Sequence, residues 1–261
     1  MRVFDFNRAI VRRPSPEVVE GLRAGEAPAP SYEGVSREHQ AYVEALAGAG
    51  VEVTILDPLP GHPDSIFVED PALVFPEGAI LLRPGAPSRA GEAEHLAPVL
   101  RDLFPTLLTL AEGNVDGGDI LVTPDRVFIG LSDRTNAAGA RGLQDLLARL
   151  GRDSVIIRPP PETLHLKSGS SLIAEDRILV TPAIAAAGLF EGYHLLVVPH
   201  GEEAGANTLR VNDSLLAGAE YPATLELLER EGLSPVPLEV AEIARIDAGL
   251  TCMSLRWWSL D

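Results

Sequence analysis

The stretch Ser171-Leu-Ile-Ala-Glu-Asp-Arg-Ile-Leu-Val-Thr181 consists of two short aliphatic runs on either side of a polar turn. Aliphatic and β-branched flanks around such a turn predict a β-hairpin. The same pattern occurs in three further segments, at 70–82, 119–130 and 208–217. A hairpin that recurs every ~40–50 residues indicates a propeller-like array of repeated units.

Each hairpin is followed by a helical pattern and then by one further apolar strand. The helices are expected at 92–104, 136–150, 182–189 and 222–231. The strands after them are expected at 106–110, 154–158, 194–198 and 234–240. The repeating unit is therefore strand-strand-helix-strand, with a short and glycine-interrupted helix in the third copy.

The two ends of the chain supply a fifth unit. We expect strands at 251–258 and 2–11, an amphipathic helix at 36–47 that begins at Ser36, and a strand at 51–56. Pairing of the first two strands gives the order of the other units and closes a ring. We therefore predict an α/β fold in one domain over residues 1–261, a five-bladed α/β propeller of ββαβ repeats with pseudo-fivefold symmetry. A proline-rich segment at about 14–31 belongs to no blade, and we expect it to be a lid-like loop.

The charge balance restricts the partners. The chain has 21 basic and 38 acidic residues, a formal net charge of −17. This acidity disfavours nucleic acid and anionic membrane surfaces and suits a cationic substrate. No apolar run reaches the ~18 residues of a membrane helix, and the start of the sequence has no signal-peptide pattern. A single free thiol fits a reducing compartment, so we expect a cytoplasmic protein.

Cys252 is the only cysteine of the chain. One thiol cannot form an internal disulfide, and alone it cannot build a zinc site. A lone cysteine that performs chemistry is most often a nucleophile with a histidine elsewhere in the sequence as its acid/base partner. The structural alternative is a buried apolar thiol in a core strand.

Polar residues precede the hairpins at equivalent places. If the repeat is correct, Asp70, Asp116, His165 and Cys252 converge at one mouth of the ring. Cys252 would then be a nucleophile and His165 an acid/base, with Asp116 orienting His165 or holding substrate. The acidic residues that add negative charge for a cationic group are Asp64, Glu69 and Asp70. The alternatives are turn or capping roles for the acids and a satisfied core position for His165.

Metal and cofactor motifs are weak. His194 and His200 do not have the spacing of a zinc helix. Gly117-Gly118 lacks both the Lys-Ser/Thr and the spaced third glycine of a phosphate-binding loop. We predict no metal and no cofactor.

Six segments resemble the dimethylarginine dimethylaminohydrolase family and occur in that family's order. They are Asp64-Ser-Ile-Phe-Val-Glu-Asp70, Arg83-Pro-Gly-Ala-Pro-Ser-Arg89, Val115-Asp-Gly-Gly-Asp-Ile-Leu121, Leu131-Ser-Asp-Arg-Thr-Asn136, Leu164-His-Leu-Lys-Ser168 and Thr251-Cys-Met-Ser-Leu255. The family is similar to the other guanidino-group-modifying enzymes of the pentein superfamily. That superfamily has the five-bladed α/β propeller, in agreement with the repeat.

The resemblance implies roles for individual residues. Cys252 is the nucleophile, His165 the general acid/base, and Asp116 the carboxylate of the triad, where some members carry Glu. The residues implied in substrate binding are Asp70 for the guanidinium, Arg89 and Arg134 for the α-carboxylate, Leu22 as lid residue, the Ile246 backbone for the α-amino group, and Asp64 and Glu69 near the guanidinium.

The implied reaction is hydrolysis of asymmetric dimethylarginine and monomethylarginine to citrulline and the methylamine, through a covalent thiouronium on Cys252. The implied partner is a small cationic guanidino substrate, on a monomer or homodimer, without cofactor. Arginine deiminase, a related guanidino or ureido hydrolase, or an amidinotransferase is the enzymatic alternative. The alternative outside catalysis is a binding propeller like translation initiation factor 6, which would not need a nucleophile, base and carboxylates at one mouth.

Overall fold

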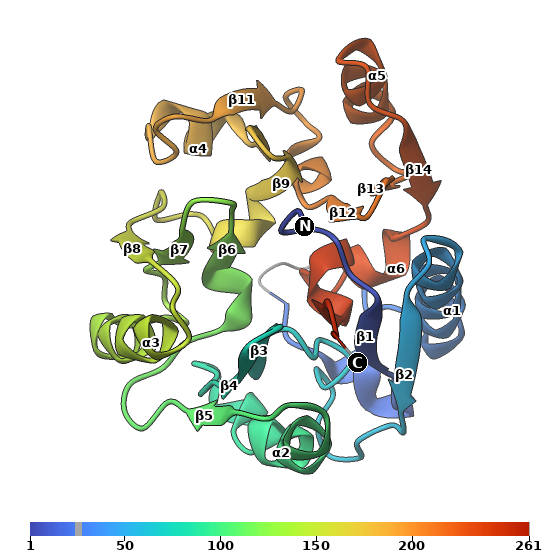
Figure 1. Cartoon of the computed structure of the whole chain (residues 1–261). Coiled ribbons are helices and arrows are strands. Elements are labelled where there is room, and N and C mark those ends of the chain that lie inside the picture. Colours follow the sequence, from blue (N-terminus) through green and yellow to red (C-terminus); the bar gives the residue numbers. More distant parts are fainter. Residues whose placement is uncertain (24–27, 261) are drawn as a thin grey trace.

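The computed structural model describes residues 1–23 and 28–260, and within these residues the chain forms five three-stranded sheets around a central axis. Helices cover the outer side of the ring (Figure 1). From the axis outwards the sheets are β15-β1-β2, β3-β4-β5, β6-β7-β8, β9-β10-β11 and β12-β13-β14. The predicted five-bladed α/β propeller is confirmed.

The strands are β1 (Arg8–Arg12), β2 (Glu52–Leu56), β3 (Ala72–Phe75), β4 (Gly78–Leu81), β5 (Leu107–Thr109), β6 (Ile120–Val122), β7 (Val127–Gly130), β8 (Ser154–Ile157), β9 (Ser170–Ala174), β10 (Arg177–Val180), β11 (His194–Val197), β12 (Leu209–Val211), β13 (Ser214–Gly218), β14 (Pro235–Leu238) and β15 (Leu255–Trp257). The α-helices are α1 (Tyr32–Gly48), α2 (Glu92–Leu103), α3 (Ala137–Arg149), α4 (Pro182–Ala186), α5 (Pro222–Arg230) and α6 (Ala241–Ala244). The 3₁₀ helices are η1 (Pro16–Glu20), η2 (Pro87–Arg89), η3 (Gly117–Asp119), η4 (Leu166–Ser168), η5 (Glu203–Ala206) and η6 (Leu250–Met253).

Every blade has the same connectivity. Its inner two strands are antiparallel, as in β6–β7, where Leu121 lies opposite Phe128. Its outer strand is parallel to the middle one, as in β7–β8, where Phe128 lies opposite Val155. Parallel strands need a crossover, and the helix between the middle and outer strands supplies it. The fifth blade is closed by both ends of the chain, because β15 pairs antiparallel with β1.

The helices pack on the blades through one apolar face. In α3 the buried residues Ala140, Leu143 and Leu147 recur at helical spacing and join the core formed with β6 and β7. Asn136 caps this helix, since its side chain accepts a hydrogen bond from the Gly139 N–H at 2.8 Å. The third-blade helix, α4, has only five residues, as its short sequence predicted.

Three predicted boundaries are wrong. The first helix begins at Tyr32 rather than Ser36, because Ser31 is the residue that caps it, accepting from the Gly34 N–H. The segment 2–7 is not part of β1, since Asp5 folds back onto Arg2 through side-chain and backbone hydrogen bonds. The C-terminal segment forms η6 before β15 starts, so Cys252 lies in a 3₁₀ turn and not in a strand.

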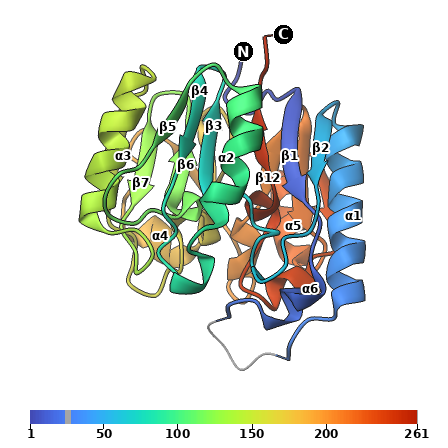
Figure 2. The same cartoon turned by 90° about the horizontal axis from the view of Figure 1, so that it is seen from below.

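The two ends of the ring axis differ. Figure 2 shows both chain ends at one end of the axis, and α6 with the loop after β1 at the other. The predicted lid-like segment contains η1, while its residues 24–27 lie outside the described residues. No helix in the described part of the chain is both long and apolar enough to cross a membrane.

Candidate active site

A narrow pocket of about 120 Å³ lies at the α6 end of the axis. Nine of the ten predicted site residues line it; Glu69 does not. The lining residues are Leu22, Arg23, Asp64, Phe67, Asp70, Arg89, Asp116, Arg134, Leu164, His165, Ile246, Asp247, Ala248 and Cys252. The repeat therefore brings together residues that are up to 230 positions apart in sequence, as Leu22 and Cys252 are.

Short 3₁₀ turns place the reactive side chains. Asp116 is the N-cap of η3 and His165 the N-cap of η4, so each stands just before the inner strand of its blade. Cys252 lies within η6, before β15. Because the inner strands of all blades begin at the same end of the axis, these side chains meet at one mouth.

His165 and Asp116 form a hydrogen-bonded pair. The Nε2 atom of His165 is 3.1 Å from Oδ2 of Asp116, whose other oxygen accepts the Gly85 N–H at 2.6 Å. Burial disfavours the imidazolium, but the hydrogen bond to Asp116 and the charges of Asp70 and Asp119 outweigh burial. Together they raise the pKa of His165 to about 9. At neutral pH His165 is therefore protonated, and Asp116 holds its Nε2 atom.

Gly117 and Gly118 make room for this pair. A Cβ on Gly118 would lie 2.8 Å from Nδ1 of His165, and one on Gly117 would lie 2.0 Å from the Glu69 carbonyl oxygen. The Gly118 N–H also donates to Asp70 at 2.9 Å. The glycine pair in the sequence is therefore explained by close packing beneath the imidazole.

Asp70 is held by a buried arginine. Arg89 forms an ion pair with Asp70, and its Nη2 atom is 2.7 Å from Glu92. The same guanidinium donates to the carbonyl oxygens of Phe67 and Asp64, at 2.9 and 3.2 Å. Burial favours the neutral form of Asp70, but the charge of Arg89 overcomes this and lowers its pKa. Asp70 is therefore a fixed carboxylate beside His165.

Cys252 is a half-buried thiol in an acidic setting. Burial, followed by the charges of Glu69 and Asp70, raises the pKa of Cys252 to about 12, while Lys167 acts in the opposite direction. The resting side chain is thus a thiol rather than a thiolate at neutral pH. A cation bound among the same carboxylates would reverse this balance, because it stabilises the thiolate.

Glu69 points away from this pocket. Its Oε1 atom is 2.5 Å from Nζ of Lys167 and 3.2 Å from Nη2 of Arg256, and Glu69 lines a second cavity at the other end of the axis. It therefore lies beneath Cys252, where its charge acts on the thiol without facing the pocket. The sequence did not reveal this, since neighbouring residues 69 and 70 face opposite ends of the ring.

The remaining predicted residues, Leu22, Asp64, Arg134 and Ile246, also line the pocket. Oδ1 of Asp64 accepts the Leu22 N–H at 2.9 Å, so Asp64 anchors the segment after η1. Ile246 follows α6 and is buried. Within the described residues the guanidinium of Arg134 has no ion pair, although it lines the pocket. It is therefore available to an anionic group.

Sequence reasoning missed the supporting role of Asp119. This fully buried carboxylate accepts hydrogen bonds from Ser132 and Thr135, each at 2.6 Å, and from the Leu166 N–H at 3.0 Å. It thus ties the loop that carries Arg134 to the turn that carries His165. The only sequence signal was its place in the Val115–Leu121 segment, where it reads as a turn residue.

One group of the described residues has metal-like spacing. The ligand atoms of Asp70, Asp116 and His165 lie within 4.8 Å of one another. However, Asp70 is already paired with Arg89, and Nε2 of His165 is already hydrogen-bonded to Asp116. The three side chains fit a hydrogen-bonded ion-pair network better than a metal site.

A five-bladed α/β propeller with a cysteine, a histidine and carboxylates at one mouth defines a pentein of the guanidino-group-modifying class. No protein-family model matches the chain. It is 35% identical to N(G),N(G)-dimethylarginine dimethylaminohydrolase of Pseudomonas aeruginosa, over 97% of this chain and 100% of that one. It is 36% identical to the enzyme of the same name from Streptomyces coelicolor, over 95% and 96% of the two chains. The chain therefore belongs to the dimethylarginine dimethylaminohydrolase family.

Solved structures of dimethylarginine dimethylaminohydrolases have the same fold as this chain. A mutant of the Pseudomonas aeruginosa protein complexed with citrulline matches with a TM-score of 0.93 at 34% identity, over 97% of this chain and 100% of that chain. A dimethylarginine dimethylaminohydrolase adduct with S-methyl-L-thiocitrulline matches with a TM-score of 0.92 at 35% identity, over 96% and 99%. The N-terminal domain of a cyanobacterial arginine dihydrolase, 18% identical with a TM-score of 0.84 over 95% and 97%, shares the fold.

Proposed function

We propose that this chain hydrolyses asymmetric dimethylarginine and monomethylarginine to citrulline and the methylamine. The observation that carries the proposal is the convergence of Cys252, His165, Asp116 and Asp70 in one pocket. The names of the two bacterial relatives and the citrulline in the matching structure support the choice of substrate.

The pocket suits a substrate with a cationic head and a zwitterionic tail. Asp70 is the fixed carboxylate that grips the guanidinium. Arg134, which has no ion pair in the described residues, binds the α-carboxylate at the entrance. Arg89 already donates to Asp70 and Glu92, so its contribution to carboxylate binding is the smaller one. Leu22 covers the tail, and the Ile246 backbone contacts its α-amino group.

The first half-reaction forms a thiouronium. Binding of the guanidinium near Asp70 lowers the pKa of Cys252, and the thiol loses its proton to solvent. The thiolate attacks the central guanidinium carbon. Protonated His165 then gives its proton to the departing dimethylamine nitrogen, and the carbon–nitrogen bond breaks.

The second half-reaction releases citrulline. Neutral His165, held by Asp116, now removes a proton from water, which attacks the thiouronium carbon. The adduct's hydroxyl proton passes to solvent as the citrulline carbonyl forms, and the carbon–sulfur bond breaks. Cys252 leaves as a thiolate that regains a proton from solvent, and His165 is again protonated. Overall, one water is consumed and one amine is released for each citrulline, without a cofactor.

The test is citrulline release from asymmetric dimethylarginine, monomethylarginine and arginine, measured side by side with Cys252→Ser as control. We expect turnover of both methylated substrates and complete loss in the variant. Turnover of arginine alone would make the protein a deiminase. No citrulline from any of the three would reject the proposed reaction.

We also propose a cytoplasmic location and a monomeric or homodimeric state, without nucleic acid as partner. The single free thiol and the net charge of −17 support these proposals. Cell fractionation and light scattering of the purified protein test them.

A further inference from the structure

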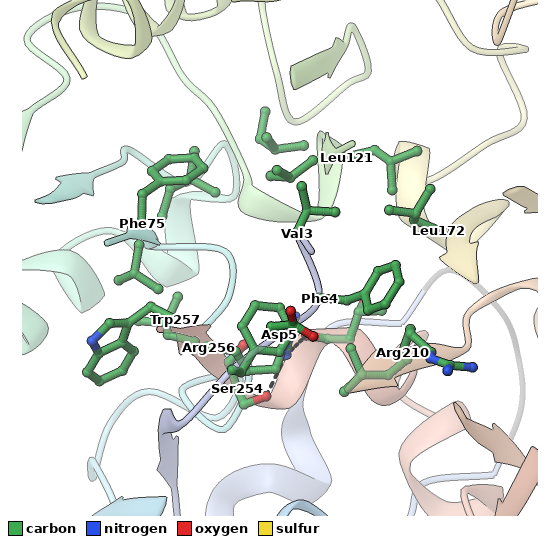
Figure 3. Close-up of a pocket in the computed structure, with 18 of the residues that line it drawn as sticks. Val3, Phe4, Asp5, Phe75, Leu121, Leu172, Arg210, Ser254, Arg256 and Trp257 are labelled. Atoms are coloured by element: carbon green, nitrogen blue, oxygen red, sulfur yellow. Dashed lines mark hydrogen bonds between the residues drawn. The ribbon is translucent and has the colours of Figure 1, made fainter. Parts of the chain in front are cut away.

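A larger cavity of about 380 Å³ lies at the other end of the ring axis, away from Cys252 and His165. Its size is that of a small-molecule site. Figure 3 shows its apolar walls, which come from the N-terminal segment and from inner strands; they include Val3, Phe4, Leu121, Leu172 and Trp257. The proposed reaction makes no use of this cavity.

The polar lining of the cavity is cationic in a strongly acidic protein. Its basic residues are Arg2, Arg152, Lys167, Arg210 and Arg256, against the two carboxylates Asp5 and Glu69. Two acids outside the lining, Asp213 and Glu77, pair with Arg2 and Arg152. Even with these partners included, one positive charge has no counter-charge.

Two places in the cavity carry more positive than negative charge, whereas Arg2 has two acidic partners, Asp5 and Asp213. On the cavity floor, Lys167 and Arg256 share a single oxygen of Glu69, so two cations face one carboxylate. The Nε atom of Arg256 and the Oε2 atom of Glu69 are both buried without a hydrogen-bond partner. On the wall, Arg210 forms no ion pair within the described residues and donates only to the Asn212 carbonyl oxygen. Lys167 and Arg256 are only 10% and 11% exposed and share one carboxylate, so an anion beside them would be stabilised; Arg210 is half-buried and adds positive charge.

We propose that this cavity binds a small amphipathic monoanion, with its apolar body between the strand walls and its carboxylate against the basic floor. Apolar walls with a few convergent polar groups are the usual composition of a small-molecule site. A carboxylate accepts charge-assisted hydrogen bonds from both guanidinium and ammonium groups. The charge balance excludes a cation, which would add to the uncompensated positive charge.

Occupancy would slow catalysis, a consequence that rests on the proposed function. Lys167 and Glu69 lie beneath Cys252 and act on its pKa in opposite directions. An anion beside Lys167 offsets the charge that favours the thiolate, so the thiol becomes harder to ionise. We expect the anion to lower kcat/KM without competing for the pocket at the α6 end.

The chain has a built-in reporter, because its two tryptophans, Trp257 and Trp258, both line the cavity. Intrinsic fluorescence of the resting protein is titrated with octanoate, octylammonium and octanol. We expect a saturable change with octanoate and at least about tenfold weaker binding of the other two, equal to ~1.4 kcal/mol. No saturable change with octanoate, or equal binding of octylammonium, would overturn the proposal.

Two variants test whether octanoate binds in this cavity. Val122 and Leu172 line the cavity on β6 and β9 and are half-buried, so Val122→Phe and Leu172→Phe reduce its volume. We expect each folded variant to bind octanoate at least about tenfold more weakly, with citrulline formation in the absence of octanoate unchanged. Unaltered octanoate affinity in a folded variant, checked by circular dichroism, contradicts the site. The fluorescence titration needs no turnover, so it stands even if the proposed reaction fails.

Discussion

The turns before β9 and before β12 occupy the same place in neighbouring blades but have different roles. In the first, the N-cap residue His165 faces the pocket and pairs with Asp116. In the second, the N-cap residue Glu202 turns to the outside. Its carboxylate accepts the N–H groups of Ala223 and Thr224, at 3.0 and 2.7 Å, at the start of α5.

The difference shows that the repeat supplies positions and the individual blade decides their use. The N-cap side chain of His165 is 14% exposed and lies among carboxylates, which shift its pKa. A half-exposed N-cap beside a helix N-terminus satisfies free backbone donors instead. We therefore expect variants in the first turn to affect turnover and variants in the second to affect stability.

The largest effect is expected for His165→Asn. Loss of the acid and base should reduce kcat on the order of 10³-fold, within the range for general acid–base catalysis. Some stability should be lost as well, because the imidazolium offsets the charges of Asp116, Asp70 and Asp119 in the folded protein. Steady-state kinetics and thermal unfolding measure the two. A loss of kcat no larger than that of Glu202→Ala would contradict the distinction between the two turns.

The pH dependence of kcat/KM tests whether the His165–Asp116 pair gives the first turn its catalytic role. The proposed reaction needs a Cys252 thiolate and a protonated His165. With pKa values near 12 and 9, their joint population rises about tenfold per pH unit up to pH 9 and then levels off. We expect kcat/KM to follow this course. Asp116→Asn removes the interaction that raises the pKa of His165, so the levelling should occur at lower pH. An unmoved profile would show that Asp116 does not tune His165.

A smaller effect is expected for Gly118→Ala. The added Cβ would lie 2.8 Å from Nδ1 of His165, so the imidazole must shift from Asp116. Displacement of a catalytic group costs about tenfold or more in kcat. Gly232→Ala is the control, because Gly232 has a positive φ and no neighbour within 4 Å of the added Cβ. We expect this variant to lose stability and to keep its activity. Full activity in Gly118→Ala would refute the close-packing argument.

The smallest effect is expected for Glu202→Ala. Loss of a helix cap destabilises by about 1 kcal/mol, and we expect kcat and KM to stay unchanged. Chemical denaturation and steady-state kinetics of the same preparation check both. A reduced kcat would mean that the fourth blade also contributes to catalysis.

The sequence contained enough to predict the fold and most of the pocket. Period and turn chemistry located the hairpins, and the repeat then required Asp70, Asp116, His165 and Cys252 to meet. The sequence has no signal for the direction in which a side chain points at a turn. Glu69 was therefore expected beside the guanidinium pocket, but it lines the second cavity at the other end of the axis. Residues 2–7 have an apolar pattern like a strand, yet the Arg2–Asp5 hydrogen bonds bend them across the second cavity.

We expect Cys252 to form a covalent bond to the guanidino carbon of the substrate. The direct measurement is mass spectrometry of His165→Asn after acid quenching with S-methyl-L-thiocitrulline, whose methanethiol leaves more readily than an amine. We expect one added mass equal to the probe less methanethiol, confined to the peptide that contains Cys252 and absent in Cys252→Ser. Consumption of the probe without an adduct, or an adduct on another residue, would contradict the account.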